Sequence, residues 1–398
     1  MFSSSRRKLS NLLKHVKHES PEFQEVILSL LKDYLNGQWQ NATSKNIHIE
    51  KLRGGMSNYV FQITLPQVIQ KEVKDEPKTV IVRLYQSVDE NSTYQHMSDT
   101  LAYICLSERK FGPKLFGIFP GGRIEEYIDA KPLKASQIRQ PNFSCAIAEK
   151  IAIIHSMTLP LSKKRDLLFD FMNNWLVGFN KNSQDWKIET VEDKDCFNKF
   201  KSTDLMSEVS WLRTFLGNNN APLLFCHNDL QQGNILVCSN TINEKKPKLV
   251  VIDYEYSFYN YRAFDFANHF YEYTMNYESN SYPYFVIDEK LYPSPEIQVC
   301  FFRQYLRVFN ELQRLKGNND SYIHSCLDND DSVNDVSEEE HKLLIETSNF
   351  RLASNLFWAI WAAFRSRSST NFKYWEYCIA RLDAYYRVKE EITKGLKL

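Results

Sequence analysis

The pattern of hydrophobic and polar positions changes near residue 129. Before that residue, β-branched and aromatic side chains form short runs bounded by turn residues, which is typical of strands. Strands are predicted at residues 47–52, 59–65, 79–85, 114–119 and 123–128, and one helix, from its apolar spacing, at residues 93–110. The N-terminal part of the chain is therefore predicted to be a small antiparallel five-stranded sheet with one helix.

Helical spacing dominates after the short break at residues 129–132. Helices are predicted at residues 143–157, 205–216, 265–276, 296–315, 338–364 and 372–392, and short strands at residues 223–227, 234–237 and 248–252. The predicted fold class is α+β, with a small sheet lobe and a large, mostly helical lobe. We assign residues 1–45 to a leader and first helix, 46–128 to the N-terminal lobe and 129–398 to the C-terminal lobe.

The leader MFSSSRRKLSNLLKHVKH contains several Lys and Arg residues, no acid, and leucines at helical spacing. A mitochondrial presequence has these features, and so does a basic amphipathic helix lying on a membrane surface. Short basic leaders without either role are also common. We interpret the segment as a plain leader that runs into a first helix near residues 24–35.

An acidic segment, DNDDSVNDVSEEE at residues 328–340, has too few apolar residues to pack and is predicted to be a solvated loop. Its acids resemble a calcium-binding loop, but Val333 stands where that loop requires glycine. Ser337 and Glu340 form a capping box that predicts the start of the next helix.

Composition excludes several classes of protein. Lys plus Arg and Asp plus Glu both number 49, so no net charge attracts the chain to nucleic acid or to anionic membranes. The eight cysteines form no CxxC pair, and several lie in apolar runs, as reduced cytosolic thiols do. No stretch is apolar for long enough to span a bilayer. We therefore expect a cytoplasmic protein that neither binds nucleic acid nor integrates into a membrane.

The stretch FCHNDLQQGNILV, residues 225–237, interrupts an apolar run with groups that are unfavourable to bury without partners. Asp229 and Asn234 have the Asp-to-Asn interval of the protein-kinase catalytic loop. There the Asp accepts the proton of the attacking hydroxyl, and the Asn holds Mg²⁺. We expect Gly233 to let the backbone turn between them. Alone, Asp229 could cap a helix, and His227 could be a core histidine that orients the loop.

Asp253 and Glu255 follow a buried strand in KLVVIDYEY. Two acids at such a place are costly to bury unless a cation neutralises them. Mg²⁺ prefers oxygen and is commonly held by one or two carboxylates with nucleotide phosphates. An isolated Asp-to-Asn interval is common, so the prediction depends on the whole order of strand, His-Asn-Asp, Asn, strand and acidic pair.

The N-terminal lobe offers nucleotide-binding candidates. RGGMSN, residues 53–58, could place backbone N–H groups over ATP phosphates, although a hairpin turn needs no ligand. Arg83 projects from the third strand, where a protein kinase has its lysine, and Arg can bind phosphate oxygens bidentately. The backbone from Glu126 to Ile128 is expected to meet adenine.

These residues resemble the choline and ethanolamine kinases, which share the protein-kinase-like fold of the aminoglycoside phosphotransferases. The matching segments include RGGMSNYVFQITLP, VIVRLY, FCHNDLQQGNIL, VVIDYEYSFYNYRAFDFANHFYEY and NLFWAIWAAFRS, and they run in family order from residue 46 to 390. The resemblance implies ATP- and Mg²⁺-dependent phosphorylation of choline to phosphocholine for phosphatidylcholine synthesis, by a homodimer. An ethanolamine or dual-specificity kinase is one alternative, and a catalytically inactive nucleotide-binding relative is another.

The resemblance also implies site residues. It implies Asp229 as the catalytic base, Asn234, Asp253 and Glu255 at the metal, and Ser57, Asn58, Arg83 and Gln231 near the nucleotide. It implies a choline pocket lined by Tyr256, Glu272, Tyr277, Trp358, Trp361 and Tyr377. A quaternary ammonium has no N–H to donate, and each aromatic face stabilises it by about 0.5–2 kcal/mol. Without a ligand, such aromatic pairs are usually core packing.

Three positions depart from the family pattern. Gln232 stands where the family often has Glu, which removes a charge beside the metal. Asp99 replaces a Glu that faces Arg83, so that ion pair is expected to be longer or to be remade by Glu108. Tyr273 replaces a frequent Trp. None of the three removes a group that phosphoryl transfer requires.

Overall fold

The computed structural model describes residues 20–52, 58–66, 76–85, 90–182, 186, 188, 190–217, 221–315, 335–367 and 372–395. The chain divides into two compact units, Met1–Ala130 and Lys131–Leu398. The predicted leader, most of the RGGMSN connector and most of the acidic segment lie outside the described residues.

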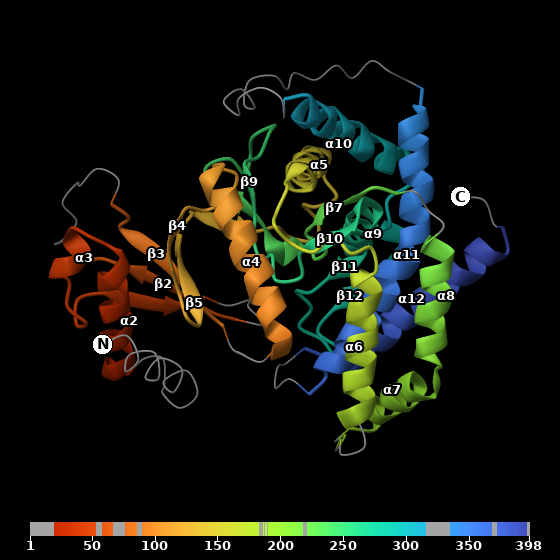
Figure 1. Cartoon of the computed structure of the whole chain (residues 1–398), viewed down its shortest axis with the longest axis horizontal. Coiled ribbons are helices and arrows are strands. Elements are labelled where there is room, and N and C mark those ends of the chain that lie inside the picture. Colours follow the sequence, from red (N-terminus) through yellow and green to blue (C-terminus); the bar gives the residue numbers. More distant parts are fainter. Residues whose placement is uncertain are drawn as a thin grey trace. The chain divides into compact units, whose positions relative to one another are not determined.

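The N-terminal unit contains the predicted five-stranded antiparallel sheet (Figure 1). Its strand order is β1-β2-β3-β5-β4. Its elements are β1 (His48–Lys51), β2 (Asn58–Thr64), β3 (Thr79–Tyr85), α4 (Glu90–Glu108), β4 (Leu115–Phe119) and β5 (Gly122–Glu126). Gly121 makes the turn between β4 and β5 with a φ of 100°, a conformation that favours glycine.

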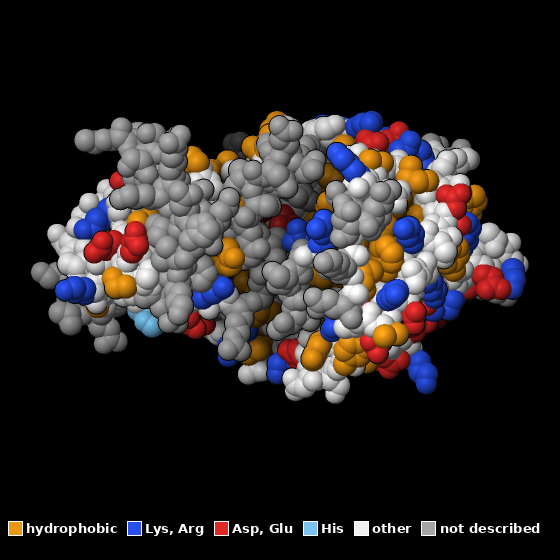
Figure 2. All heavy atoms as spheres, turned by 90° about the horizontal axis from the view of Figure 1, so that it is seen from below, with side chains coloured by type: hydrophobic (Ala, Val, Ile, Leu, Met, Phe, Trp, Pro, Cys, Tyr) orange, Lys and Arg blue, Asp and Glu red, His pale blue; other side chains and the backbone are white. Residues whose placement is uncertain are grey.

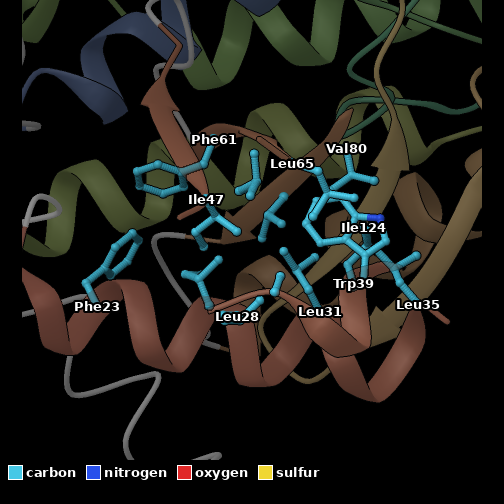
Figure 3. Packing of buried hydrophobic residues seen from close by; sticks show 14 of the residues in the cluster. Phe23, Leu28, Leu31, Leu35, Trp39, Ile47, Phe61, Leu65, Val80 and Ile124 are labelled. Atoms are coloured by element: carbon cyan, nitrogen blue, oxygen red, sulfur yellow. The ribbon is translucent and has the colours of Figure 1, made fainter. Parts of the chain in front are cut away.

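Two short helices, α2 (Pro21–Tyr34) and α3 (Gln38–Asn41), complete this unit. The side chain of Ser20 caps α2 by accepting a hydrogen bond from the Phe23 N–H at 3.2 Å. The apolar face of α2 packs with residues of β2, β3 and β5 in one buried cluster, which Figure 3 shows from close by. Trp39 of α3 extends this cluster, and its Nε1 donates to the Pro77 carbonyl at 2.8 Å.

The second unit is mostly helical (Figure 1). Its helices are α5 (Pro141–Ser156), α6 (Leu167–Asn182), α7 (Val191–Ser202), α8 (Leu205–Gly217), α9 (Arg262–Glu272), α10 (Pro295–Leu315), α11 (Glu338–Arg365) and α12 (Tyr374–Thr393). Helix α11 packs against α12, α9 and α6, while α10 packs against α5. The predicted capping box between Ser337 and Glu340 starts α11 and is confirmed. Helices α6 and α7 were not predicted from the sequence.

Short strands position the loops of this unit. They are β6 (Ala130–Pro132), β7 (Leu223–Cys226), β8 (Ile235–Cys238), β9 (Leu249–Val251), β10 (Phe258–Tyr261), β11 (Met275–Asn276) and β12 (Val286–Ile287), with 3-10 turns η3 (Gln232–Asn234) and η4 (Glu289–Leu291). Strand β7 pairs with β10, and β8 pairs with β9, both antiparallel. The polar loop after Cys226 therefore leaves one small sheet and enters another.

The surface agrees with the balanced composition. On the face drawn in Figure 2, basic and acidic side chains of the helical unit are interspersed rather than segregated. Within the described ranges, no helix is both long and apolar enough to cross a membrane. The seven cysteines in these ranges are free thiols.

Candidate active site

The loop between β7 and β8 is held by its own histidine. His227 Nδ1 accepts the Asp229 N–H at 3.3 Å, so its Nε2 carries the proton and donates to the Ile252 carbonyl at 3.0 Å. His227 is fully buried. It therefore orients the loop as a core histidine, which is the structural role considered for it from the sequence.

Asn228 fixes the same loop from the other side. Its φ is 66°, in the left-handed region that disfavours residues other than glycine. Its Nδ2 donates to the Tyr256 carbonyl at 2.9 Å, and its Oδ1 accepts from Asn260 Nδ2 at 2.9 Å. A polar side chain in the apolar run is therefore satisfied by a neighbouring strand and loop, and the strained backbone is held in place.

The structure brings Asp229 and Asn234 into direct contact. Asn234 Nδ2 donates to Asp229 Oδ2 at 2.8 Å and to the Asp229 carbonyl at 2.9 Å. The Ile252 N–H donates to the Asn234 carbonyl at 3.0 Å. Asp253 directly follows Ile252, so its backbone lies close to Asn234. The predicted base and two predicted metal ligands are thus gathered at the ends of β8 and β9.

Negative charge is concentrated here. Burial raises the pKa of Asp229 well above its ordinary value, and the carboxylates of Glu272, Asp253 and Glu255 raise it further. The hydrogen bond from Asn234 acts in the opposite direction. Such a group of acids is unfavourable without a counter-charge.

The donor set fits a hard divalent cation. Because Asn234 uses its NH₂ group on Asp229, its amide oxygen is left as an acceptor, and within the described part of the chain nothing donates to it. Asp253 and Glu255, both half-buried, supply carboxylate oxygens. Amide and carboxylate oxygens are the ligands that Mg²⁺ prefers. Asp253 has a φ of 69°, so its backbone also adopts an unfavourable conformation at this place.

The 3-10 turn η3 differs from expectation at Gly233. This glycine does not adopt a positive φ. In this part of the site, Asn228 and Asp253 are the residues whose φ is positive. A Cβ at Gly233 would lie 2.9 Å from Gln231 Oε1, so a larger residue there would displace the end of the Gln231 side chain. That oxygen caps the turn by accepting the Gly233 N–H at 2.7 Å. Gln232, the departure noted above, is buried.

One group of predicted pocket residues surrounds Tyr256. Its ring packs against Trp358 at 5.4 Å and Trp361 at 6.2 Å between centroids, both edge to face. Trp361 Nε1 donates to the Tyr256 hydroxyl at 2.7 Å. The ring centroids of the two tryptophans, both on α11, lie 5.0 Å apart. Together they form a buried aromatic wall.

A second group surrounds Glu272 at the end of α9. Its Oε1 accepts the Tyr277 hydroxyl at 3.2 Å, while its buried Oε2 has no hydrogen-bond partner among the described residues. Burial raises the pKa of Glu272 to about 7. Tyr377 of α12 lies nearby, against Phe372 and Phe285. A carboxylate bordered by aromatic rings is suited to an organic cation.

Both groups lie within electrostatic reach of the predicted base. The carboxylate of Asp229 contributes to raising the pKa of Tyr256, Tyr277 and Tyr377, and burial is the largest cause in each case. The carboxylate of Glu272 also raises the pKa of Asp229. The structure therefore brings together the base, the metal candidates and the pocket candidates of the helical unit.

Sequence reasoning missed three buried residues at this site. Arg381 of α12 lies over the Tyr271 ring at 3.8 Å and lowers the pKa of Glu272. His269 Nδ1 donates to the Leu230 carbonyl at 3.0 Å, and burial lowers its pKa to about 4, so it is neutral. Asp265 accepts backbone bonds from the catalytic loop. A polar or ionisable side chain inside an apolar run was the available signal for each, as it was for His227.

Most of the predicted nucleotide-binding residues lie in the N-terminal unit. Asn58 begins β2 and is buried, while Ser57 lies outside the described residues. Glu126 ends β5, with its carboxylate accepting the Lys114 N–H at 2.9 Å, and Ile128 is half-buried. The buried Arg83 Nε donates to Glu125 Oε1 at 3.2 Å.

One expectation about that unit's charges is corrected. Asp99 forms an ion pair with Arg123, a residue that the sequence analysis did not consider. Glu108 is exposed at the end of α4 and makes no ion pair with Arg83. The buried Arg83 is instead balanced by Glu125, because the two lie on the adjacent strands β3 and β5.

Comparison with known proteins identifies relatives over most of the chain. The choline/ethanolamine kinase family model matches residues 49–386. Choline kinase alpha of Mus musculus is 35% identical over 383 residues, covering 91% of this chain and 80% of that protein. Choline/ethanolamine kinase of Rattus norvegicus is 33% identical over 366 residues, covering 92% and 86%. A probable ethanolamine kinase of Arabidopsis thaliana is 31% identical over 366 residues, covering 91% and 85%.

Solved structures show the same fold. A choline kinase from Cryptosporidium parvum superposes with a TM-score of 0.71 at 23% identity, covering 93% of this chain and 97% of that one. A Plasmodium vivax ethanolamine kinase gives a TM-score of 0.70 at 21% identity, covering 96% and 93%. The predicted protein-kinase-like fold class is confirmed. The chain belongs to the choline/ethanolamine kinase family and is a phosphotransferase that acts on an alcohol acceptor.

Proposed function

We propose that this protein transfers the γ-phosphoryl group of ATP to the hydroxyl of choline in the presence of Mg²⁺. The product, phosphocholine, would enter phosphatidylcholine synthesis. The contact between Asn234 Nδ2 and Asp229 Oδ2 at 2.8 Å supports this proposal most directly. It joins an acid able to accept a proton to an amide whose oxygen is left for a cation.

Asp229 would orient the choline hydroxyl and accept its proton. A carboxylate within reach of the hydroxyl can accept its proton in the transition state. Asn234, Asp253 and Glu255 would hold Mg²⁺, which would offset the charge on the transferring phosphoryl group. In the N-terminal unit, Ser57, Asn58 and Arg83 would bind phosphates, and Glu126 to Ile128 would contact adenine. Gln231 would lie beside the nucleotide.

The acceptor is proposed from the chemistry of the pocket residues. Aromatic faces from Tyr256, Trp358 and Trp361 supply attraction for a quaternary ammonium that hydrogen bonds cannot provide. Tyr277 and Tyr377 would add further faces, and Glu272 would supply the opposite charge.

Ethanolamine is the second candidate acceptor, and one observation favours it. Glu272 Oε2 is buried without a hydrogen-bond partner in the described ranges, and a primary ammonium could donate to it. Choline could not make that bond. A dual-specificity enzyme would use the carboxylate for one acceptor and the aromatic faces for the other.

A turnover assay with matched acceptors tests the proposal. ADP release would be measured with choline, with ethanolamine, and with the neutral isostere of choline in which carbon replaces the quaternary nitrogen. We expect kcat/KM for choline to exceed that of the isostere by at least about tenfold. Only choline carries the positive charge that the aromatic faces and the Glu272 carboxylate attract. A higher kcat/KM for ethanolamine than for choline would make the protein an ethanolamine kinase. No turnover with either acceptor would overturn the proposed function.

Assembly and location follow from resemblance alone. We propose a cytoplasmic homodimer, in line with the family. Light scattering on the purified chain would give the mass in solution, and a mass of 46.9 kDa, that of one chain, would contradict the dimer.

A further inference from the structure

Three polar side chains that the proposed mechanism does not use lie together in the helical unit. They are His155 of α5, Asp265 of α9 and Tyr305 of α10, and each is at most 1% exposed. His155 Nε2 lies 3.1 Å from Asp265 Oδ2, and His155 Nδ1 lies 3.0 Å from the Tyr305 hydroxyl. One series of polar side chains therefore joins the three helices α5, α9 and α10.

Asp265 extends this series to the catalytic loop. Its Oδ2 accepts the His227 N–H at 2.8 Å, and its Oδ1 accepts the Asn228 N–H at 2.6 Å. Asn228 is the residue with a φ of 66°, and Asp229 follows it directly. A buried carboxylate thus holds the strained backbone that presents the predicted base.

The direction of each hydrogen bond follows from the partners. Both oxygens of Asp265 accept backbone N–H groups, as an ionised carboxylate does, so His155 Nε2 carries a proton and donates. Burial raises the pKa of Tyr305 well above its ordinary value, so its hydroxyl keeps its proton and donates to His155 Nδ1. A neutral imidazole satisfies both neighbours at once.

A metal ion is the other reading of this cluster. Ligand atoms of His155, Cys226 and Asp265 lie within 4.8 Å of one another. A metal would require the Cys226 thiolate, but burial raises the pKa of this thiol well above its ordinary value. Its Sγ donates to the Asn260 carbonyl at 3.5 Å, and both imidazole nitrogens of His155 are engaged. Hydrogen bonding therefore accounts for every group without a metal.

We propose that His155 and Tyr305 are positioning residues, which hold Asp265 so that it fixes the backbone of residues 227–228 and, with it, Asp229. Neither residue would touch a substrate. This inference depends on the proposed function in one respect, the assignment of Asp229 as the catalytic base. Because a misplacement of about 1 Å can lower a rate by about 100-fold, a loosened loop should lower kcat and leave both KM values nearly unchanged.

The kinetic test uses the full chain and graded variants. His155→Leu removes both bonds and should lower kcat with choline by about 100-fold, whereas Tyr305→Phe removes one and should lower it by about tenfold. His155→Gln keeps an amide donor for Asp265 and should recover part of the loss. Adding Tyr305→Phe to His155→Leu should lower kcat by less than about twofold more, because the series is already broken.

A second measurement does not depend on the reaction. Amide hydrogen exchange of the peptide containing residues 226–229 should become faster in His155→Leu and Tyr305→Phe. Tyr385→Phe is the matched control, since it also removes a bond from a fully buried phenol, here to Glu208 at 2.6 Å. In this control both the exchange of the loop and kcat should equal those of the wild type.

The outcomes separate the two proposals. Slower turnover with unchanged KM values, faster loop exchange and an unaffected control would support the positioning role. Unchanged loop exchange in His155→Leu, or equal losses in Tyr385→Phe, would overturn it, as would binding of added Zn²⁺ that depends on His155 and Cys226. If the wild type turns over neither acceptor, the proposed function fails. The exchange measurement still decides whether His155 and Tyr305 hold the loop through Asp265.

Discussion

The side chains of Asp229 and Asn234 are joined by a hydrogen bond of 2.8 Å across a loop that connects two separate small sheets. Asn234 also donates to the backbone carbonyl of Asp229, so the two residues keep one mutual geometry. The amide is thereby turned so that its oxygen faces away from Asp229. The same hydrogen bond therefore positions both Asp229, the proposed base, and Asn234, a proposed metal ligand.

Asp229→Asn should lower kcat by about 100- to 10,000-fold, the range that a general base contributes. The change preserves shape but removes the group that accepts the proton, so the KM for ATP should change by less than about threefold. Steady-state ADP release at saturating choline measures both quantities. Asp204→Asn, at an exposed acid, is the matched control and should leave kcat unchanged. A kcat for Asp229→Asn within tenfold of the wild type would contradict the assignment of the base.

Trp361→Leu should raise the KM for choline by about tenfold, because it removes an aromatic face worth up to about 2 kcal/mol. It also removes the bond that Trp361 Nε1 donates to the Tyr256 hydroxyl. The KM for ATP should stay within about twofold, and initial rates over a matrix of both substrates measure the two constants.

A matched control separates the pocket from packing. Trp375 is equally buried on α12, where its ring contacts Phe179, Phe197 and Phe200 instead. Trp375→Leu should lower the melting temperature while leaving the KM for choline near that of the wild type. Equal increases of both KM values in Trp361→Leu would argue that this tryptophan is core packing.

Features that depend on short-range pattern were predictable from the sequence. The five strands of the N-terminal unit are β-branched or aromatic runs between turn residues, and the capping box at Ser337 marks the start of α11. The loop around Asp229 was conspicuous because polar groups in an apolar run require partners. These features are decided by neighbours within a few residues.

Features that depend on distant partners were not predictable. Half of the residues of helix α7 are charged, and it buries only Phe197 and Phe200, so its apolar spacing is weak. Asp265 binds amides 37 and 38 residues earlier in the chain, and no local pattern indicates that pairing. Arg123 likewise pairs with Asp99 through tertiary packing, and Arg83 pairs with Glu125 rather than with Glu108.

The pH dependence of choline use should follow Glu272. Burial raises its pKa to about 7, so the carboxyl is mostly neutral at pH 6 and mostly charged at pH 8. Because only the charged form attracts an ammonium group, kcat/KM for choline should rise by about tenfold from pH 6 to pH 8. The neutral isostere of choline should show a flatter profile, since it gains nothing from the charge.

Glu272→Gln tests the same group through stability. A raised pKa in the folded protein means that the folded state binds more protons than the unfolded state between pH 4.5 and about 7. Stability is therefore lost as the pH rises through this range. Glu272→Gln should raise the melting temperature at pH 8 relative to the wild type, while it increases the KM for choline. A lower melting temperature at pH 8 would show that the charge is already compensated.

Arg123→Met should destabilise the N-terminal unit by about 3–5 kcal/mol, the usual cost of removing one partner from a buried ion pair. Arg123 is fully buried, bonds Glu125 Oε1 at 2.5 Å, pairs with Asp99 and stacks over the Tyr103 ring at 3.8 Å. Since a protein of two units need not unfold in one step, hydrogen exchange of the β3 and β5 peptides is the measurement to use. Arg109→Met, at an exposed arginine of the same unit, is the control and should change stability by less than about 0.5 kcal/mol. Equal exchange in the two variants would mean that the buried charge of Arg123 and its pairing with Asp99 and Glu125 contribute little to the stability of the unit.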